Sequence, residues 1–432
     1  MSPAEIGLIG FGLLLVCLFM GIHIGFSLIV VGFFGSLVIS GSTAALANAS
    51  IVPFAQVSDA NFAVIPLFML MGEFIACGGI GVEAYLTARA WLGQFRGGLA
   101  MASVAACAIF AAVCGSSMAT AMVMGRMAYP EMKKYQYSIE LASGCLCAGG
   151  SIGIMIPPSI QFIVIGILTE VSIGKLFLAG ILPGMTQALF YIIAIYIMCR
   201  ISPRLGPAAP NLPIKEKVQT LKLTWPVVFL FIVVIGGIYA GIFTAQEAGA
   251  IGAFGALLIG LLRRQMSRQG FNDALTNAVK STGMLLLLLI GAFIFNRFLA
   301  ISRIPAITSE WIVGLQVDRY MVLWIILVLY IILGMFFDIT AMIILTVPIF
   351  FPVIVALKFD PVWYGVLICR VSEMGFISPP FGLNLFGLVG VINVPLSTMY
   401  RGVIPFLIAD CFHLILLVAI PGIALLIPNM MV

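Results

Sequence analysis

Two diproline segments inside long apolar stretches limit the folds that this chain can adopt. The first stretch is GGSIGIMIPPSIQF at residues 149–162, and the second is RVSEMGFISPPFGLN at residues 370–384. Proline has no amide hydrogen and its ring clashes with the preceding helical turn, so neither stretch can form one continuous helix. At membrane depth, the backbone groups freed at such a break must face protein or a water-filled cavity. Two broken helices in corresponding halves of a chain are typical of secondary transporters.

The composition indicates an all-α, polytopic membrane protein. Of the 432 residues, 62% are hydrophobic and 9% are charged, and the mean hydropathy is +1.21. These values exclude an ordinary soluble domain. The net charge of +5 is small and dispersed, so no nucleic-acid partner is expected. The cysteines lack metal-ligand spacing, and His23 and His413 are isolated in the sequence, so no resident metal or cofactor is expected.

Spanning runs alternate with interrupted segments along the chain. Apolar runs of about 20 residues, enough to cross a bilayer, lie at residues 3–20, 22–40, 55–78, 175–199, 225–242, 244–262, 281–300 and 403–428. Residues 97–133 and 319–357 each join two apolar helices through a short polar tip, which predicts two re-entrant hairpins. Residues 138–171 and 360–391 are predicted helices broken at their prolines, and residues 85–96 and 263–280 are predicted to lie along the interface.

A constant offset of 222 residues relates the two halves. At this offset the following prolines coincide: Pro130 with Pro352, Pro157 and Pro158 with Pro379 and Pro380, and Pro183 with Pro405. We therefore predict an internal duplication, with a first repeat at 1–205, a cytoplasmic linker at 206–222 and a second repeat at 223–432. Each repeat is predicted to cross the membrane five times, and an odd number of crossings inverts the second repeat relative to the first.

The distribution of basic residues predicts the orientation. With the N-terminus outside, most lysines and arginines fall in the cytoplasm, and those left outside are Lys175, Arg303, Arg319 and Lys358. The remaining basic residues, Arg126, Arg297 and Arg370, fall within elements at membrane depth. The positive-inside rule therefore predicts that the N-terminus lies outside, and the crossing count then predicts the same side for the C-terminus.

The hairpin tips and helix breaks are predicted to bind sodium. Unwound backbone offers carbonyl oxygens, and hydroxyl or carboxylate oxygens can complete a coordination shell. The first predicted site consists of Ser116, Ser117, Gly149, Ser151, Gly153 and Pro157, and the second of Asp338, Thr340, Gly375, Ser378 and Pro379. The alternative is that serine and glycine only permit close helix packing in lipid. An intramembrane carboxylate such as Asp338 needs a cation or an internal partner, unless it lies at the interface.

Four residues near these elements are candidates for binding substrate: Thr120, Ser159, Arg370 and Asn384. Half-helices that begin after Ser159 and Phe381 direct positive dipole ends toward a carboxylate. Arg370 has two interpretations. It lies three residues before Glu373, so the two side chains can pair on one helical face, or its guanidinium can bind a substrate carboxylate in a bidentate manner.

Several motifs together resemble one transporter family. The segments are IPLFMLMGEFIACGGIG (65–81), GSSMATAMVMGRMAYPEMKK (115–134), GSIGIMIPPSI (150–160), LFLAGILPG (176–184), GIFTAQEAGAIGAFGALLIG (241–260) and SPPFGLNLF (378–386). In this order and spacing they resemble the large membrane subunit of tripartite ATP-independent periplasmic (TRAP) transporters, over nearly the whole chain. Some members of the family carry Asp where this chain has Thr120, so the details of that tip are not transferred.

The resemblance implies a sodium-coupled, elevator-type importer of organic acid anions in the bacterial inner membrane, with both termini in the periplasm. It also implies two protein partners, a small four-helix membrane subunit and a soluble periplasmic protein that delivers the substrate. Because this chain begins directly at the large subunit, the small subunit is expected to be a separate polypeptide.

Two other classes of protein share some of these features. A stand-alone sodium:dicarboxylate symporter has the same hairpins, broken helices and inverted repeats but needs no delivery protein. An intramembrane enzyme is a remote alternative, because the sequence has no HExxH, paired-carboxylate or nucleophile motif, and no phosphate-binding GxxxxGK[ST] loop. The sequence does not determine which organic acid is carried, how many sodium ions move in each cycle, or the oligomeric state.

Overall fold

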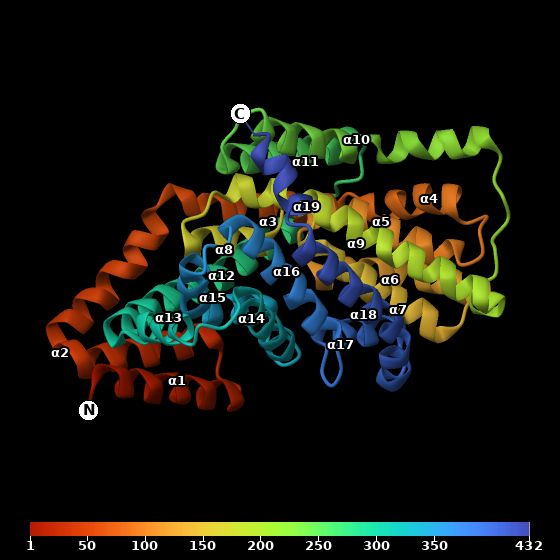
Figure 1. The fold of residues 1–432 in the computed structure, drawn as a ribbon. Helices are drawn as coiled ribbons and strands as arrows, with labels where there is room; N and C mark the ends of the chain where they lie inside the picture. The colour runs from red at the N-terminus through yellow and green to blue at the C-terminus, as the bar shows by residue number, and fades with distance from the viewer. Residues whose placement is uncertain (432) are drawn as a thin grey trace.

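The computed structural model describes residues 1–431, and this part of the chain consists of helices joined by loops (Figure 1). Among the described residues, eight helices are long and apolar enough to cross a membrane. In the view of Figure 1, α1, α2 and α13 lie at one end of the molecule and α4 to α7 lie at the other. The all-helical fold of a polytopic membrane protein, expected from the composition, is confirmed.

The first half of the chain contains one hairpin and one broken helix between longer helices. Its elements are α1 (Pro3–Phe19), α2 (Ile24–Ser58), η1 (Ala60–Ala63), α3 (Val64–Cys77), α4 (Ile80–Leu92), the hairpin α5 (Gly98–Cys114) and α6 (Ser117–Lys134), the broken helix α7 (Ile139–Ser151), η2 (Ile152–Ile154) and α8 (Ile160–Thr169), then α9 (Ile173–Ile201) and η3 (Pro203–Leu205).

The second half also contains one hairpin and one broken helix between longer helices. It contains α10 (Ile214–Tyr239), α11 (Ala245–Leu262), α12 (Arg268–Ser302), α13 (Ile304–Gly314), the hairpin α14 (Arg319–Gly334) and α15 (Ile339–Ala356), the broken helix α16 (Pro361–Ile377) and α17 (Leu383–Ile392), then α18 (Leu396–Ala419) and α19 (Gly422–Asn429). Both hairpins and both broken helices of the predicted fold are therefore present.

Helix boundaries recur at the offset of 222 residues found in the sequence. The bounds of α6 shifted by this offset are those of α15, and α5, α7 and α8 begin within one residue of α14, α16 and α17 after the same shift. Matching N-cap side chains start these helices. Ser116 and Asp338 accept backbone N–H groups at the tips of the hairpins, and Ser138 and Asp360 do so at the start of the broken helices.

The halves differ in where their early helices are divided. In the first half α2 continues through a kink at Gly41 (φ 81°), and the chain breaks after Ser58, where Asp59 caps η1. In the second half the break falls between α11 and α12, and α12 then runs without interruption for 35 residues. The predicted interfacial segment 263–280 is therefore mostly the first part of α12, continuous with a spanning helix.

Three sequence predictions need correction in detail. The run at 403–428 is divided between α18 and α19 at Pro421, because proline cannot donate the amide hydrogen that would continue α18. The segment 206–222 is not wholly a linker, since α10 begins at Ile214. Helix α13 was missed, although its counterpart at the offset is α4 (Ile80–Leu92), part of which was predicted to lie along the interface.

Helices of the two halves pack against each other at the hairpins and broken helices. Helix α8 packs against α15, and α17 packs against α6, so the second part of each broken helix contacts the hairpin of the other half. Helices α7 and α18 also approach closely, because a Cβ atom on Gly144 would lie 2.1 Å from the carbonyl oxygen of Gly402. Only glycine leaves room for this backbone contact, which holds the first broken helix against α18.

Candidate functional site

The tip of the first hairpin lies against the first helix break. A Cβ atom on Gly153 would be 2.8 Å from the carbonyl oxygen of Ser116 and 3.0 Å from Oγ1 of Thr120. The Ser117 hydroxyl donates to the carbonyl oxygen of Ser151 at 3.4 Å. The structure therefore brings four of the predicted sodium-binding residues together: Ser116, Ser117, Ser151 and Gly153.

The first break itself is enclosed by protein. Residues 151–159, which include Pro157, are all buried. Gly115 at the hairpin tip adopts φ +64°, and a Cβ atom there would be 2.5 Å from the carbonyl oxygen of Pro158. Gly149 lies on another side, where it packs against α5. The tip thus contacts the break through Gly115 and its neighbours, whereas the position of Gly149 suits close helix packing.

The tip of the second hairpin is capped by a carboxylate. Oδ1 of Asp338 accepts the backbone N–H groups of Thr340 at 2.9 Å and Ala341 at 3.4 Å. Asp338 is exposed and Thr340 is buried. None of the ion pairs in the described part of the chain includes Asp338. Asp338 therefore has a local structural role at the start of α15, and its other carboxylate oxygen is left for a cation or for water.

The second break is more open than the first. The backbone N–H of Ser378 donates to the carbonyl oxygen of Gly375 at 3.0 Å, and the Ser378 hydroxyl donates to that of Met374 at 2.5 Å. Gly375 packs tightly on α14, because a Cβ atom there would be 2.6 Å from a carbonyl oxygen of that helix. Pro379 is partly exposed, and Phe381 is 46% exposed. The peptide bonds within both proline pairs are cis.

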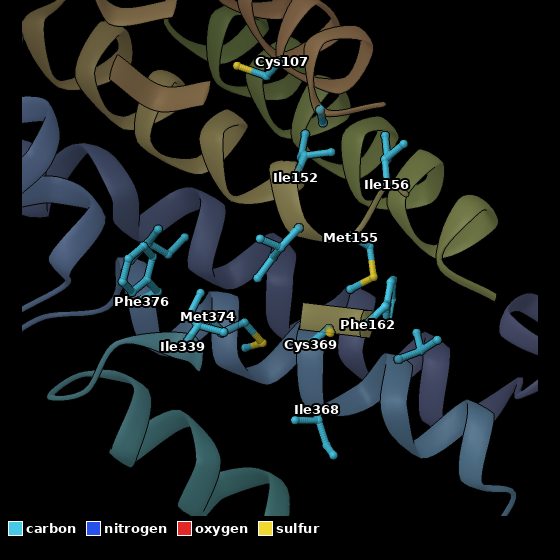
Figure 2. Close-up of a cluster of buried hydrophobic side chains, with 14 of the residues drawn as sticks. Cys107, Ile152, Met155, Ile156, Phe162, Ile339, Ile368, Cys369, Met374 and Phe376 are labelled. Atoms are coloured by element: carbon cyan, nitrogen blue, oxygen red, sulfur yellow. The ribbon is translucent and has the colours of Figure 1, made fainter. Parts of the chain in front are cut away.

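One hydrophobic cluster joins the two breaks. Figure 2 shows Ile152, Met155 and Phe162 around the first break near Cys369 of α16. It also shows Ile339, the residue between Asp338 and Thr340, beside Met374 of the second broken helix. The second tip therefore lies next to the second break, and both breaks belong to the same packed core.

The structure gives each of the other substrate candidates a different setting. The Thr120 hydroxyl donates to the carbonyl oxygen of Ser116 at 2.7 Å. Nδ2 of Asn384 donates to the carbonyl oxygen of Cys147 at 3.0 Å, which ties α17 to α7. The hydroxyl of Ser159 and Oδ1 of Asn384 are buried without a hydrogen-bond partner in the described part of the chain. These two atoms are available to a ligand, whereas the Thr120 hydroxyl is already engaged.

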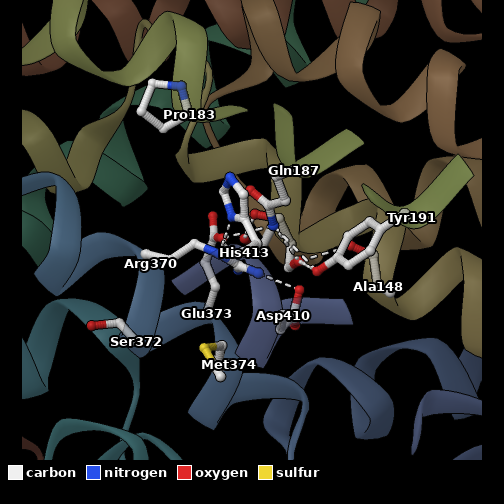
Figure 3. A network of polar contacts seen from close by, with 12 residues as sticks. Ala148, Pro183, Gln187, Tyr191, Arg370, Ser372, Glu373, Met374, Asp410 and His413 are labelled. Atoms are coloured by element: carbon white, nitrogen blue, oxygen red, sulfur yellow. Dashed lines mark hydrogen bonds and ion pairs between the residues drawn. The ribbon is translucent and has the colours of Figure 1, made fainter. Parts of the chain in front are cut away.

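Arg370 is the centre of a buried polar cluster (Figure 3). Its side chain is 0% exposed, its Nη1 is 3.1 Å from Oε2 of Glu373, and its Nη2 pairs with the carboxylate of Asp410. Its Nε donates to Nδ1 of His413 at 3.0 Å. Of the two interpretations of Arg370, the structure contains the internal pair with Glu373. Contact with substrate stays a prediction.

Two further residues extend this cluster toward the first half of the chain. Nε2 of Gln187 lies 2.9 Å from Oε2 of Glu373, 3.2 Å from the hydroxyl of Tyr191 and 3.3 Å from Oγ of Ser151. Ser151 belongs to the first break, so Gln187 connects the two broken helices through side-chain hydrogen bonds. An amide nitrogen carries two hydrogens, so these three acceptors compete for its donors.

Part of this cluster was not predicted from the sequence. His413 is isolated in the sequence but lies beside Arg370, and Thr186 is 2.8 Å from its other ring nitrogen. Asp410 falls inside the predicted span 403–428, where an ionisable residue indicates an internal partner. The sequence therefore contained a signal for Asp410. Gln187 and Tyr191 carry no comparable sequence signal, because only the packing of α9 against α16 brings them to Glu373.

Comparison with known proteins identifies the family. Residues 11–423 match the family model described as tripartite ATP-independent periplasmic transporter, DctM component. The chain therefore belongs to the DctM family. Membership agrees with the resemblance found in the sequence motifs, and the spanning helices agree with an integral membrane protein.

Individual DctM-family proteins resemble this chain over most of their length. It is 35% identical over 366 residues to the C4-dicarboxylate TRAP transporter large permease protein DctM of Pseudomonas aeruginosa, covering 84% of this chain and 85% of that protein. It is 29% identical to the sialic acid TRAP transporter large permease protein SiaM of Vibrio cholerae, covering 96% of both chains. These relatives are transporter permeases, so the prediction that this chain is not an enzyme is confirmed.

A solved structure supports the fold. The crystal structure of the Alcanivorax borkumensis YdaH transporter, described as having an unusual topology, superposes with a TM-score of 0.64 and 15% sequence identity. The superposition covers 88% of this DctM-family chain and 90% of the YdaH chain. At this identity the similarity concerns the fold alone.

Proposed function

We propose that this chain imports an organic acid anion across the bacterial inner membrane by a sodium-coupled elevator movement. In this proposal it acts with a small four-helix membrane subunit and with a periplasmic binding protein that delivers the substrate. The substrate class rests on relatives named for C4-dicarboxylates and for sialic acid, both of which carry carboxylate groups.

The observation that carries the proposal is the contact between the first hairpin tip and the first break. The carbonyl oxygen of Ser116 faces Gly153, and the Ser117 hydroxyl bonds to Ser151. Carbonyl and hydroxyl oxygens gathered at interrupted helices are the groups that coordinate sodium in transporters of this kind. We assign a first sodium site to these residues and a second to the tip at Asp338 and Thr340 with the break at Ser378 and Pro379.

An anion site beside these cations follows from the atoms left without partners. The Ser159 hydroxyl stands at the N-terminus of α8, where the positive helix end favours a carboxylate. Oδ1 of Asn384 can accept from a substrate hydroxyl or contact a cation. Sodium would order both hairpin tips and so complete the anion site, which couples the two binding events.

The moving part in this proposal comprises both hairpins and both broken helices, which already form one packed body through the α8–α15 and α6–α17 contacts. The remaining helices form the scaffold. We also propose that the inverted repeats at 1–205 and 223–432 are related by a duplication, that the segment at 206–222 is cytoplasmic, and that both termini face the periplasm.

Uptake by the reconstituted complex tests this function. Liposomes holding the two membrane subunits should take up a labelled organic acid, presented with its binding protein, when a sodium gradient is imposed. Uptake should collapse when potassium replaces sodium on both sides. Undiminished uptake in sodium-free buffer would reject sodium coupling.

A second comparison separates this function from that of a stand-alone symporter. Omitting the binding protein should abolish uptake of the same acid at the same sodium gradient. Uptake that persists without the binding protein and the small subunit would show that this chain works alone. A panel of organic acids, screened by thermal shift of the binding protein, would then identify the substrate.

A further inference from the structure

A cavity lies between α2 and α12, away from the hairpin tips and breaks. Its volume is about 710 Å³, and its wall combines polar and apolar side chains. The polar residues include Ser36, Ser40, Asn48, Asn296 and Arg297, and the apolar wall includes Ala44, Ala47, Ile51, Val52, Ala300 and Ile301. A cavity with both kinds of wall suits an amphipathic ligand.

The shape of α2 creates this cavity. A Cβ atom on Gly32 would be 2.9 Å from the backbone of Phe295, so α2 and α12 touch at this level. One turn later Ser36 reaches the cavity, and at Gly41 the backbone leaves helical geometry (φ 81°, ψ 173°). The following part of α2 supplies the far wall. The cavity therefore forms where α2 diverges from α12, next to the level at which the two helices pack tightly.

Several polar groups in the cavity have no partner in the described part of the chain. The Ser36 hydroxyl and Oδ1 of Asn296 are buried and make no hydrogen bond. Arg297 is exposed, and none of the ion pairs among the described residues includes it. A cation in an apolar helix needs a counter-charge, so the cavity presents a guanidinium and a hydroxyl donor to an anion.

Arg297 lies near the end of α12, and a long arginine side chain there can extend to the headgroup region. Arg297 lies five residues before the end of α12 at Ser302, about 7.5 Å along the helix axis. The headgroup region of a bilayer occupies about 5–8 Å on each side of the hydrocarbon core. A phosphate accepts two hydrogen bonds from a guanidinium, and acyl chains fit the apolar wall formed by residues such as Ile51 and Ile301.

We propose that this cavity binds one glycerophospholipid, with its phosphate on Arg297 and the Ser36 hydroxyl. Asn296 then selects the headgroup. Its Oδ1 atom accepts a hydrogen bond, so a headgroup that carries a donor, either the ammonium of ethanolamine or a glycerol hydroxyl, binds better than choline, which carries none. The lipid fills the space between α2 and α12 and contacts both helices.

Native mass spectrometry of the purified full chain tests the proposal. Delipidated protein titrated with phosphatidylethanolamine or phosphatidylglycerol should bind one lipid in preference to phosphatidylcholine. Arg297→Leu should weaken binding by about tenfold or more, as expected for the loss of a charge-assisted pair. Arg297→Lys keeps the positive charge but cannot donate two parallel hydrogen bonds to the phosphate. Its lipid affinity should lie between those of the wild type and Arg297→Leu. Arg268→Leu, which removes an exposed arginine from the same helix, should bind as the wild type does.

The Asn296→Leu variant tests headgroup selection separately. It should bind all three lipids with similar affinity. Equal lipid binding by wild type and Arg297→Leu would overturn the proposal. A thermal shift with inorganic phosphate alone as large as that with lipid would overturn it in favour of a simple anion site. Displacement of the lipid by the small membrane subunit would identify the cavity as a protein interface and overturn it as well.

Discussion

The two halves of the chain contribute unlike side chains to the polar cluster where they meet (Figure 3). At the offset of 222 residues, Ala148 corresponds to Arg370, Ser151 to Glu373, Ala188 to Asp410, and Tyr191 to His413. At these four positions the first half has alanines and hydroxyls, and the second half has the charged residues and a histidine. Two halves with corresponding helices thus accommodate one fully buried set of charges, because the matching positions of the first half are small or neutral.

The two breaks also differ in burial and in the charge of the neighbouring hairpin tips. Residues 151–159 in the first break are buried, whereas in the second break Pro379 is partly exposed and Phe381 is exposed. The first tip is capped by the neutral Ser116 and the second by the carboxylate of Asp338. The first half therefore forms the enclosed part of the proposed site, and the second half forms the accessible and charged part.

The largest expected effect comes from removing the central charge of the second half. Arg370→Met leaves the buried carboxylates of Glu373 and Asp410 without their cation, which should cost about 3–5 kcal/mol of stability. Thermal unfolding of the purified chain in detergent would measure the loss. Arg268→Met, on an exposed surface, is the matched control and should leave the unfolding midpoint nearly unchanged. Equal midpoints for the two variants would show that the cluster does not stabilise the fold.

Substitution of the two corresponding glycines should separate the halves. Gly153→Ala pushes against the carbonyl oxygen of Ser116, and Gly375→Ala pushes against α14, each at a cost of about 1–3 kcal/mol. We expect Gly153→Ala to raise the sodium concentration for half-maximal uptake, and Gly375→Ala to act mainly on the unfolding midpoint. Gly283→Ala, where nothing lies within 4 Å of the added carbon, is the control. An unchanged sodium dependence in Gly153→Ala would argue against the first sodium site.

The contact between the halves at Asn384 should have a smaller effect. Asn384→Ala removes the hydrogen bond to the carbonyl oxygen of Cys147, worth about 1 kcal/mol, and also removes the free Oδ1 atom. Uptake should therefore fall more than the lowered unfolding midpoint explains. Asn272→Ala, on the exposed side of α12, should change neither measurement. Uptake that falls only in proportion to folded protein would limit Asn384 to a structural role.

The smallest effect on stability is expected at the second hairpin tip. Asparagine caps a helix about as well as aspartate does, so Asp338→Asn should leave the unfolding midpoint nearly unchanged. The loss of the carboxylate charge should nevertheless weaken sodium binding by about tenfold. In the first half, Ser116→Asn also places an asparagine at the cap of the hairpin tip but removes no charge. The sodium dependence of this variant is compared with that of Asp338→Asn. If Asp338→Asn transports with the sodium dependence of the wild type, Asp338 serves only as a helix cap.

Much of the architecture could be predicted because its signals are local. Proline pairs disrupt a helix wherever they occur in one, so the breaks at Pro157 and Pro379 followed from the chain itself. Polar tips between apolar runs predicted the hairpins. The division at Pro421 and the uninterrupted α12 were not predicted, because apolar composition alone does not determine where a long run bends or continues.

The sequence by itself determined the membrane class, the two hairpins, the two broken helices and the family, since periodic apolar composition and proline chemistry act through neighbouring residues. The tertiary structure decided which polar atoms meet. Arg370 lies three residues before Glu373 on the same helix, but Asp410, His413 and Gln187 join it only because α9, α16 and α18 pack together. Such contacts depend on the approach of separate helices, for which a single sequence carries no local signal.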